Sequence, residues 1–356
     1  MSLVFFYNIS LFIGIFFVWL TENWLILWIW VELGTISIII LLSQRVNPRS
    51  VEASSKYFII QSIASLLFLF GILYHFLEVG NLELFSYYSD FSYIIILISI
   101  FVKLAVFPNP FWFVDVVSGI SFFEGFYVVI LSKIIPIYIY SLLAGSYFSF
   151  CILFLGVISI IFGSVLGINQ TNVRKIIALS SVSHMGWLVV GFPFLSYNLC
   201  LYIFILYIIM LIPLFSIASF INLDHLVKLK NFYNNFGFII IFIVSLLSLG
   251  GFPPLLGFFY KWVIFYGLLE NSMYLVCLIL IIFSLISLYF YLQLIYYVYS
   301  IYLLNLKIAY VSSFEIFGVF KNNYNLSFFL IFCILFSIVN IIGIIFLNPI
   351  LINNFF

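Results

Sequence analysis

Four ionisable side chains lie inside apolar stretches of the sequence that are long enough to cross a bilayer. They are the amines of Lys103, Lys133 and Lys261 and the carboxylate of Glu32. An ionisable group at membrane depth costs roughly 2.5–3.5 kcal/mol on insertion scales, so it marks a functional site by default. Several such groups spread along one chain predict a path for protons or other ions.

The composition indicates that membrane helices hold these groups. Of the 356 residues, 67% are hydrophobic and 6% are charged, whereas soluble domains carry about 25% charged residues. A spanning helix needs about 20 apolar residues, so this chain can supply at most ~12 spans. The apolar runs are continuous rather than alternating, which excludes a transmembrane barrel. The net charge of +1 gives no reason to expect a nucleic-acid partner.

Polar interruptions divide the chain into about eleven spans, so we predict an all-α polytopic membrane protein with a single membrane domain over residues 1–356. Residues 301–326 fit either an amphipathic helix on the membrane surface or a plain loop. The first segment lacks the basic start of a signal peptide and is therefore predicted as a span. The predicted spans are residues 3–20, 24–42, 53–77, 92–117, 122–144, 148–168, 174–191, 197–221, 237–270, 272–300 and 327–347.

The charges in the connecting loops agree with this division. Loops assigned to one side carry all the basic loop residues, and loops on the other side carry only acidic ones, as the positive-inside rule predicts. Three basic residues remain outside the loops, namely Lys103, Lys133 and Lys261. The basic side carries Arg45, Arg49, Lys56, Arg174, Lys175, Lys228, Lys230, Lys307 and Lys321, and the opposite side carries Glu22, Glu78, Glu83, Asp90 and Glu270.

Two predicted spans contain helix breakers next to a buried lysine. In 92–117, Pro108 and Pro110 follow Lys103, and in 237–270 a Gly-Gly-Phe-Pro-Pro run precedes Lys261. Proline removes a backbone donor and clashes with the preceding turn, so each helix must kink or open there. A broken helix with an ionisable neighbour in each half of a chain indicates an inverted-repeat transporter. The halves would be residues about 3–144 and 148–300, although proline kinks are also ordinary in membrane helices.

Polar residues follow the buried ionisable groups along the same helix faces. Ser92 and Ser99 share a face with Lys103, and Tyr140 and Ser141 share one with Lys133. Such rows fit either a chain of water or ordinary contacts between helices. His184 is a weaker candidate for a proton relay, because a packing histidine fits its position as well. Asp115 and Glu124 fall near the basic side, where they fit either an entry or exit for protons or solvated or paired surface charges, the second being favoured.

Four stretches of the sequence resemble one known family. They are NPRSVEASSKYFIIQSIAS (47–65), INQTNVRKIIALSSVSHMGW (168–187), LLSLGGFPPLLGFFYKW (246–262) and TENWLILWIWVELGTISI (21–38). They resemble the chain 2 family of NADH:ubiquinone oxidoreductase, respiratory complex I, in its short animal mitochondrial form. The resemblance runs from about residue 20 to about residue 300. It implies an antiporter-like subunit of the membrane arm, related to cation/proton antiporters.

The resemblance implies a role for each of the four buried groups. Glu32 corresponds to the carboxylate of an early helix, Lys103 and Lys261 to the lysines of the two broken helices, and Lys133 to the central lysine. These residues would translocate protons with energy from quinone reduction elsewhere in the complex. Glu32 would hold a proton on Lys103 when it is close, because opposite charges favour each other's ionised form.

The resemblance also implies cofactors, partners and location. The chain itself would bind no cofactor or metal and carry out no redox chemistry, because NADH, FMN, the iron–sulfur clusters and ubiquinone belong to other subunits. Its four cysteines lie singly in apolar runs, which does not fit a cluster site. The partners would be other membrane-arm subunits, phospholipids and protons. The chain would be mitochondrially encoded and lie in the mitochondrial inner membrane, with its basic loops on the matrix side.

The sequence departs from the family near the first break. Where relatives read PFHFW followed by Pro-Glu, this chain reads PNPFWFVDV, so that Pro110 replaces a histidine, Val114 a proline and Asp115 a glutamate. Histidine is the usual proton relay near neutral pH, so a relay at position 110 is in doubt. Two alternatives stay open from the residues alone. One is a free-standing cation/proton antiporter, and the other is a structural subunit that conducts no protons.

Overall fold

The computed structural model describes residues 2–44, 47–84, 88–144, 149–221, 236–253, 255–309 and 334–341. Within these ranges the chain is helical, and its extended backbone is limited to an isolated bridge between Asn23 and Glu83. The contacts divide the chain into two compact units. The first comprises residues 1–163 and 177–201, and the second comprises residues 164–176 and 202–356.

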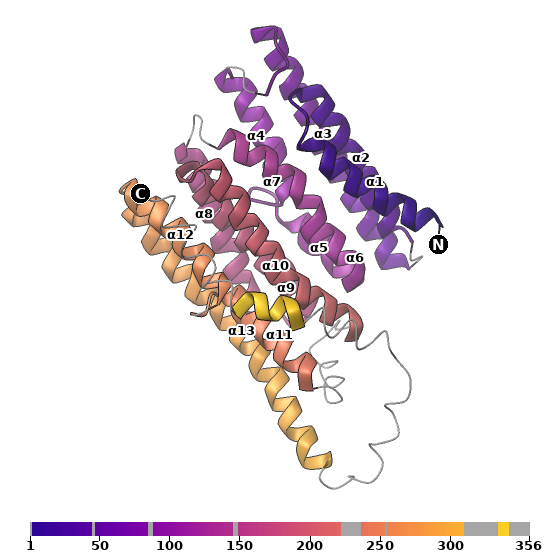
Figure 1. Ribbon diagram of the computed structural model, residues 1–356, viewed down its shortest axis with the longest axis vertical. Helices are drawn as coiled ribbons and strands as arrows, with labels where there is room; N and C mark the ends of the chain where they lie inside the picture. Colours follow the sequence, from indigo (N-terminus) through magenta and orange to yellow (C-terminus); the bar gives the residue numbers. More distant parts are fainter. Residues whose placement is uncertain are drawn as a thin grey trace. The chain divides into compact units, whose positions relative to one another are not determined.

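The first unit is organised around the long helix α3 (Pro48–Val79). Helix α3 packs against α2, α4 and α5, while α1 packs against α2, and α7 contacts α1, α2 and α4. Figure 1 shows α1, α2 and α3 running side by side. The helices that build the rest of this unit are α1 (Ser2–Val18), α2 (Trp24–Leu42), α4 (Asp90–Leu104), α5 (Phe111–Gly119), α6 (Phe122–Phe126), α7 (Ser132–Leu143), and parts of α8 (Ser149–Gly167), α9 (Val173–Gly191) and α10 (Tyr197–Ile221).

The second unit contains the other broken helix and the longest helix of the chain. Helices α11 (Phe236–Gly250) and α12 (Leu256–Glu270) both pack against α13 (Tyr274–Ala309) and against each other. Helix α13 continues nine residues past the predicted end of its span, so residues 301–309 extend that helix. The remainder of the expected surface helix, 310–326, lies outside the described residues, and of the last predicted span only 334–341 is described, as a helix.

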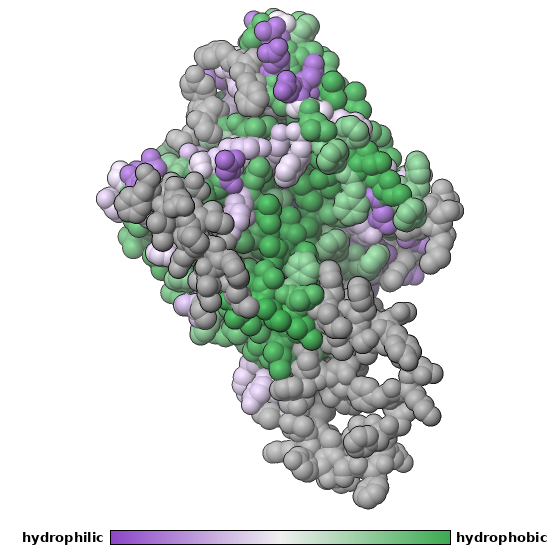
Figure 2. Space-filling model, in the orientation of Figure 1, coloured by the Kyte–Doolittle hydropathy of each residue, from purple (hydrophilic) through white to green (hydrophobic). Residues whose placement is uncertain are grey.

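The predicted membrane spans are otherwise found where the sequence placed them. Seven of the helices in the described ranges are long and apolar enough to cross a membrane unaided, and two of the remaining spans are the broken helices. Large apolar side chains are widely exposed, with Leu77 80% and Phe150 78% accessible. Figure 2 shows hydrophobic residues over most of the described part of the visible face. Soluble monomers rarely expose apolar patches of this extent, so the surface is that of a multi-pass membrane protein.

Both predicted helix breaks are confirmed. Helix α4 ends at Leu104, and α5 begins at Phe111, after a segment that contains both prolines. Ala105 at the end of α4 has φ +59°, a conformation that residues other than glycine rarely adopt. Helix α11 ends at Gly250 and α12 begins at Leu256. Proline alone does not cause a break, because Pro213 lies inside the continuous helix α10.

The structure adds an irregularity that the sequence analysis did not predict. The span over 122–144 is not a regular helix, because a π-helical segment, η1 (Tyr127–Leu131), separates α6 from α7. Pro136 lies in the second turn of α7 and cannot donate a hydrogen bond to the preceding turn. π-helical turns are rare, and where they do interrupt an α-helix they are frequently found at functional sites. Here the π-helical segment ends two residues before Lys133.

The second break depends on a contact that only glycine permits. A Cβ atom at Gly257 would lie 1.5 Å from the carbonyl oxygen of Ser248, so the start of α12 packs directly on the backbone of α11. We predict that Gly257→Ala lowers the free energy of unfolding by about 3 kcal/mol, the upper end of the usual cost of overpacking, because the added methyl group would collide with backbone. The change would appear as a lower unfolding temperature in detergent. Gly250→Ala is the control, because its Cβ would be 3.5 Å from the nearest atom; equal stability of the two variants would contradict this account.

Candidate functional site

The first candidate residue, Lys103, lies in the last turn of α4, immediately before the break. Its side chain is 5% exposed, and its Nζ has no hydrogen-bond partner among the described residues. The C-terminal turn of a helix carries partial negative charge, which favours a cation there. The end of α4 therefore stabilises a positive charge on Lys103, although its amine donates no hydrogen bond to any described residue.

A small cavity with apolar and polar side chains in its walls adjoins Lys103 within the first unit. Its volume is about 20 Å³, and helices α1, α2, α3, α4 and α7 and the π-helical segment η1 contribute its walls. This volume is enough for a water molecule. The polar side chains that line the cavity are Thr35, Tyr57, Gln61, Lys103 and Ser132.

The carboxylate of Glu32 approaches this cavity through Thr35. The hydroxyl of Thr35 donates to Oε2 of Glu32 at 3.2 Å and to the backbone carbonyl of Glu32 at 2.9 Å. The Glu32 carboxylate also acts electrostatically on Lys103, although the two groups share no hydrogen bond. The structure thus brings together two of the four predicted residues, with the cavity and Thr35 beside them.

Lys133 is fully buried and lies on α7, one residue after the cavity-lining Ser132. Its Nζ donates to Oγ of Ser181 at 3.4 Å and lies 4.2 Å from the centre of the Phe113 ring. The face of an aromatic ring attracts a cation, and a hydroxyl oxygen accepts a hydrogen bond from one. Phe113 and Ser181 are therefore uncharged residues that each present partial negative charge to the amine of Lys133. Neither Phe113 nor Ser181 lines the cavity, so the groups around the Lys133 amine differ from those around the Lys103 amine.

Lys261, in the second unit, reaches back across the second break. Its Nζ donates to the carbonyl oxygen of Gly250, the last residue of α11, at 3.0 Å. Gly251 has φ +80°, and a Cβ atom there would lie 2.8 Å from Nζ. The glycine pair therefore provides both the turn and the space in which the amine meets the carbonyl end of a helix.

The polar rows beside Lys103 and Lys133 are buried, but their hydroxyls are already bonded to the backbone. Ser99 donates to the carbonyl of Ile96 at 2.6 Å and Ser141 to that of Tyr138 at 2.7 Å, both within their own helices. Tyr140 donates to the carbonyl of Val189 at 2.7 Å. Serine commonly bonds its own helix in this way. These contacts favour the structural interpretation of the rows over a line of relays.

The three weaker candidates have different surroundings. His184 is buried in α9 at 3% exposure, and its role as a relay stays a prediction. The expectation of a surface charge was wrong for Glu124, which is 4% exposed and forms a capping box with Ser121 at the start of α6. Its carboxylate accepts the backbone N–H of Ser121 at 3.0 Å, which satisfies a helix end.

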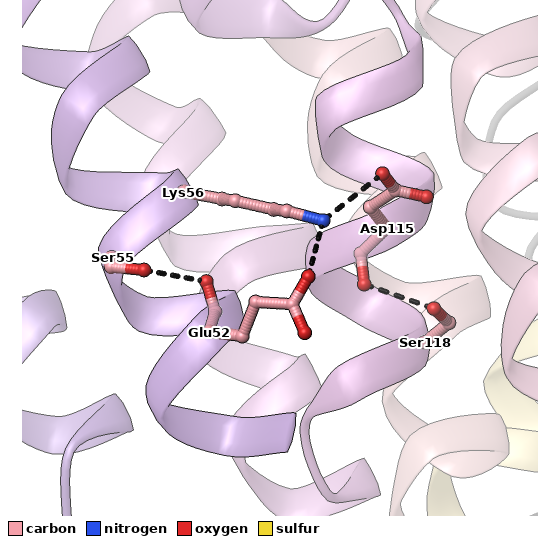
Figure 3. Close-up of polar contacts among 5 residues, drawn as sticks. All are labelled: Glu52, Ser55, Lys56, Asp115 and Ser118. Carbon is pink, nitrogen blue, oxygen red and sulfur yellow. Dashed lines mark hydrogen bonds and ion pairs between the residues drawn. The ribbon is translucent and has the colours of Figure 1, made fainter. Parts of the chain in front are cut away.

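Asp115 is a paired surface charge, which was one of its two predicted interpretations. Figure 3 shows its carboxylate on α5 meeting Lys56 on α3, whose amine also binds Glu52. The Lys56 Nζ lies 3.5 Å from Asp115 and 2.7 Å from Glu52. Helix α3 has 32 residues, about 48 Å, and is therefore longer than an apolar core of about 30 Å. The side chains of this ion cluster are exposed, and the cluster joins α5 to α3 at the surface of the first unit.

Sequence reasoning did not identify every polar group at the cavity. Gln61 and Tyr57 are buried on α3, four residues apart and hence on one helix face. A glutamine inside the run FIIQSIAS was the signal that could have found Gln61. Phe113 and Ser181 have ordinary residue types for such helices, and only the tertiary structure reveals them as neighbours of Lys133.

Comparisons with known proteins agree with this architecture. The family described as NADH:quinone oxidoreductase/Mrp antiporter, TM, matches residues 21–287. NADH-ubiquinone oxidoreductase chain 2 of Lemur catta is 34% identical over 292 residues, which is 82% of this chain and 84% of the relative. The same protein of Equus asinus is 33% identical over 290 residues, 81% of this chain and 83% of the relative.

Solved structures show the same fold at lower sequence identity. A chain of respiratory complex I from Thermus thermophilus with bound aureothin has a TM-score of 0.81 at 19% identity, covering 96% of this chain and 79% of that chain. A chain of the Mrp complex from Dietzia sp. DQ12-45-1b has a TM-score of 0.70 at 19% identity, covering 79% and 57%. The fold and the buried lysines beside its broken helices define an antiporter-like membrane protein. The chain belongs to the NADH:quinone oxidoreductase/Mrp antiporter family, and within it to the family of NADH-ubiquinone oxidoreductase chain 2.

The burial of Lys103 leads to a prediction about stability. Burying an amine costs more free energy than burying a thioether of the same length, so Lys103→Met should raise the free energy of unfolding by about 1–3 kcal/mol. Thermal unfolding in detergent, followed by tryptophan fluorescence, measures the change. Lys56→Met is the control and should give no increase, because Lys56 is exposed and paired. A less stable Lys103→Met variant would mean that the interactions of the amine outweigh the cost of burying it.

Proposed function

We propose that this chain is a proton-translocating subunit of the membrane arm of NADH:ubiquinone oxidoreductase in the mitochondrial inner membrane. The observation that carries the proposal is the buried amine of Lys103, which has no hydrogen-bond partner among the described residues and lies beside Glu32 and a cavity with five polar residues in its wall. An amine without a fixed acceptor can exchange its proton when its surroundings change. The family of this chain, with relatives named as an oxidoreductase subunit, supports the assignment to the complex.

The proposed route consists of Glu32, Lys103, Lys133 and Lys261, with His184 as a weaker candidate. The energy comes from quinone reduction in other subunits, which also hold NADH, FMN and the iron–sulfur clusters, and this chain carries no redox group. Its partners are the neighbouring membrane-arm subunits, phospholipids of the bilayer and the translocated protons. Its basic loops face the matrix.

Changes in the distance between Glu32 and Lys103 supply the coupling. At an effective dielectric constant of about 20, two opposite charges attract by about 2 kcal/mol at ~8 Å and by about 4 kcal/mol at ~4 Å. The difference of about 2 kcal/mol changes the equilibrium constant for proton release by more than tenfold, because about 1.4 kcal/mol corresponds to a factor of ten. A modest movement of α2 relative to α4 is therefore enough to load or release the amine.

The test replaces each lysine of the broken helices in the assembled complex. Lys103→Ala and Lys261→Ala should each lower NADH-driven acidification of closed membrane vesicles by about a hundredfold, the range in which proton-transfer groups contribute. Native electrophoresis should show unchanged assembly. Lys56→Ala is the control, because its amine is exposed and lies in a surface ion cluster, and it should pump as the unmodified protein does.

The outcomes separate the proposal from its two alternatives. Full assembly with undiminished pumping in both variants would favour a structural subunit. A chain that migrates apart from NADH dehydrogenase activity on native gels would favour a free-standing cation/proton antiporter. Loss of pumping with intact assembly supports conduction by this chain.

A further inference from the structure

The cavity beside Lys103 combines three buried side chains whose polar atoms lack partners. Tyr57 is 0%, Gln61 3% and Lys103 5% exposed, and all three line the cavity. The hydroxyl of Tyr57, the amide Nε2 of Gln61 and the Nζ of Lys103 have no hydrogen-bond partner within the described chain. Three unused donors beside one cavity of about 20 Å³ form a site for an acceptor the size of a water molecule, and Gln61 and Lys103 are the two that carry only donors at these atoms.

A third lining residue connects the cavity to Glu32, which does not itself line it. The single hydroxyl hydrogen of Thr35 is shared between two acceptors of Glu32, the backbone carbonyl at 2.9 Å and the carboxylate Oε2 at 3.2 Å. Unlike the hydroxyls of Ser99 and Ser141, it therefore also reaches an ionisable group. Its oxygen keeps a free lone pair, so it can accept a hydrogen bond from the cavity. Thr35 is thus placed between the carboxylate and the cavity that the amine lines.

From this arrangement we propose that the cavity binds one water molecule, which Gln61 and Lys103 hold and which links Lys103 to Glu32 through Thr35. This inference rests on the proposed proton-translocating function. The water accepts hydrogen bonds from Gln61 Nε2 and Lys103 Nζ and donates one to Thr35 Oγ1. Thr35 and Gln61 are positioning residues, because they act by orienting the water between the two titrating groups.

The proton transfer along this bridge balances without a further reactant. An N–H bond of the Lys103 ammonium breaks, and the water receives that proton while it passes another to Thr35. The hydroxyl of Thr35 passes its own proton to Glu32, where an O–H bond forms. The ammonium becomes an amine and the carboxylate a carboxylic acid, so the pair changes from two opposite charges to two neutral groups. The reverse sequence restores the charges.

The bridge is tested with isosteric and conservative variants in the assembled complex. Thr35→Val removes the hydroxyl at nearly constant volume, and Thr35→Ser keeps it. The loss of one hydrogen bond in the bridge should slow NADH-driven proton pumping about fivefold in Thr35→Val, and Thr35→Ser should restore it. Gln61→Met, which removes the amide at similar length, should slow pumping to a similar extent. Native electrophoresis checks that each variant assembles.

Repeating the Thr35→Val substitution in a Glu32→Gln variant distinguishes a bridge to Glu32 from a general effect on packing. In Glu32→Gln the route to the carboxylate is already lost, so adding Thr35→Val should cause no further decrease. An equal decrease in both backgrounds would overturn the bridge. Normal pumping by both Thr35→Val and Gln61→Met would also overturn it, while loss of pumping in Lys103→Ala would leave the proposed function standing.

An experimental map of the assembled complex that resolves ordered water gives a readout independent of activity. We expect a peak within about 3 Å of Gln61 Nε2, Lys103 Nζ and Thr35 Oγ1. The peak should disappear in Gln61→Met. A map with ordered water elsewhere and none at this position would overturn the proposal even if the variants pump slowly.

Discussion

The structure depends on how three amines are stabilised inside an apolar bundle. Each of the three lysines meets partial charges: Lys261 a helix-terminal carbonyl, Lys133 a hydroxyl and an aromatic face, and Lys103 the last turn of its own helix. A full counter-ion in contact would hold an amine in its charged form. Partial charges lower the cost of burial and still leave the proton exchangeable. This balance is what a conducting site requires.

The helix breaks provide the partial charges that Lys103 and Lys261 meet. An unbroken helix uses its carbonyls internally, and only its end presents carbonyls to other groups. In α4 the amine precedes the break, while in α12 it follows the break and reaches back to the end of α11. Both arrangements place a lysine at the carbonyl end of the first half-helix. The two sites therefore share an electrostatic principle although their local connectivity differs.

Much of this was predictable from the sequence, because composition and helix breakers act locally. The apolar runs gave the spans, and the prolines after Lys103 and the glycine pair before Lys261 gave the two breaks. The π-helical turns before Lys133 were not predicted. A proline inside a helical run can accompany either an irregular helix, as Pro136 does, or a continuous helix, as Pro213 does in α10. The burial of Glu124 was missed because a capping carboxylate resembles a surface charge in sequence. The neighbours of Lys133 come from distant segments, which no local pattern connects.

The hydrogen bonds of the polar residues restrict where a proton can travel. Ser99 and Ser141 give their hydrogens to the backbone of their own helices, so a row of hydroxyls on a helix face is not by itself a route. A relay needs a group with unused hydrogen-bonding capacity next to a space that water can enter. Within the described first unit, Tyr57, Gln61 and Lys103 meet that condition at the cavity. Glu32 does not line this cavity but accepts a hydrogen bond from Thr35, which does, so the proposed link can be removed at one hydroxyl without changing either charge.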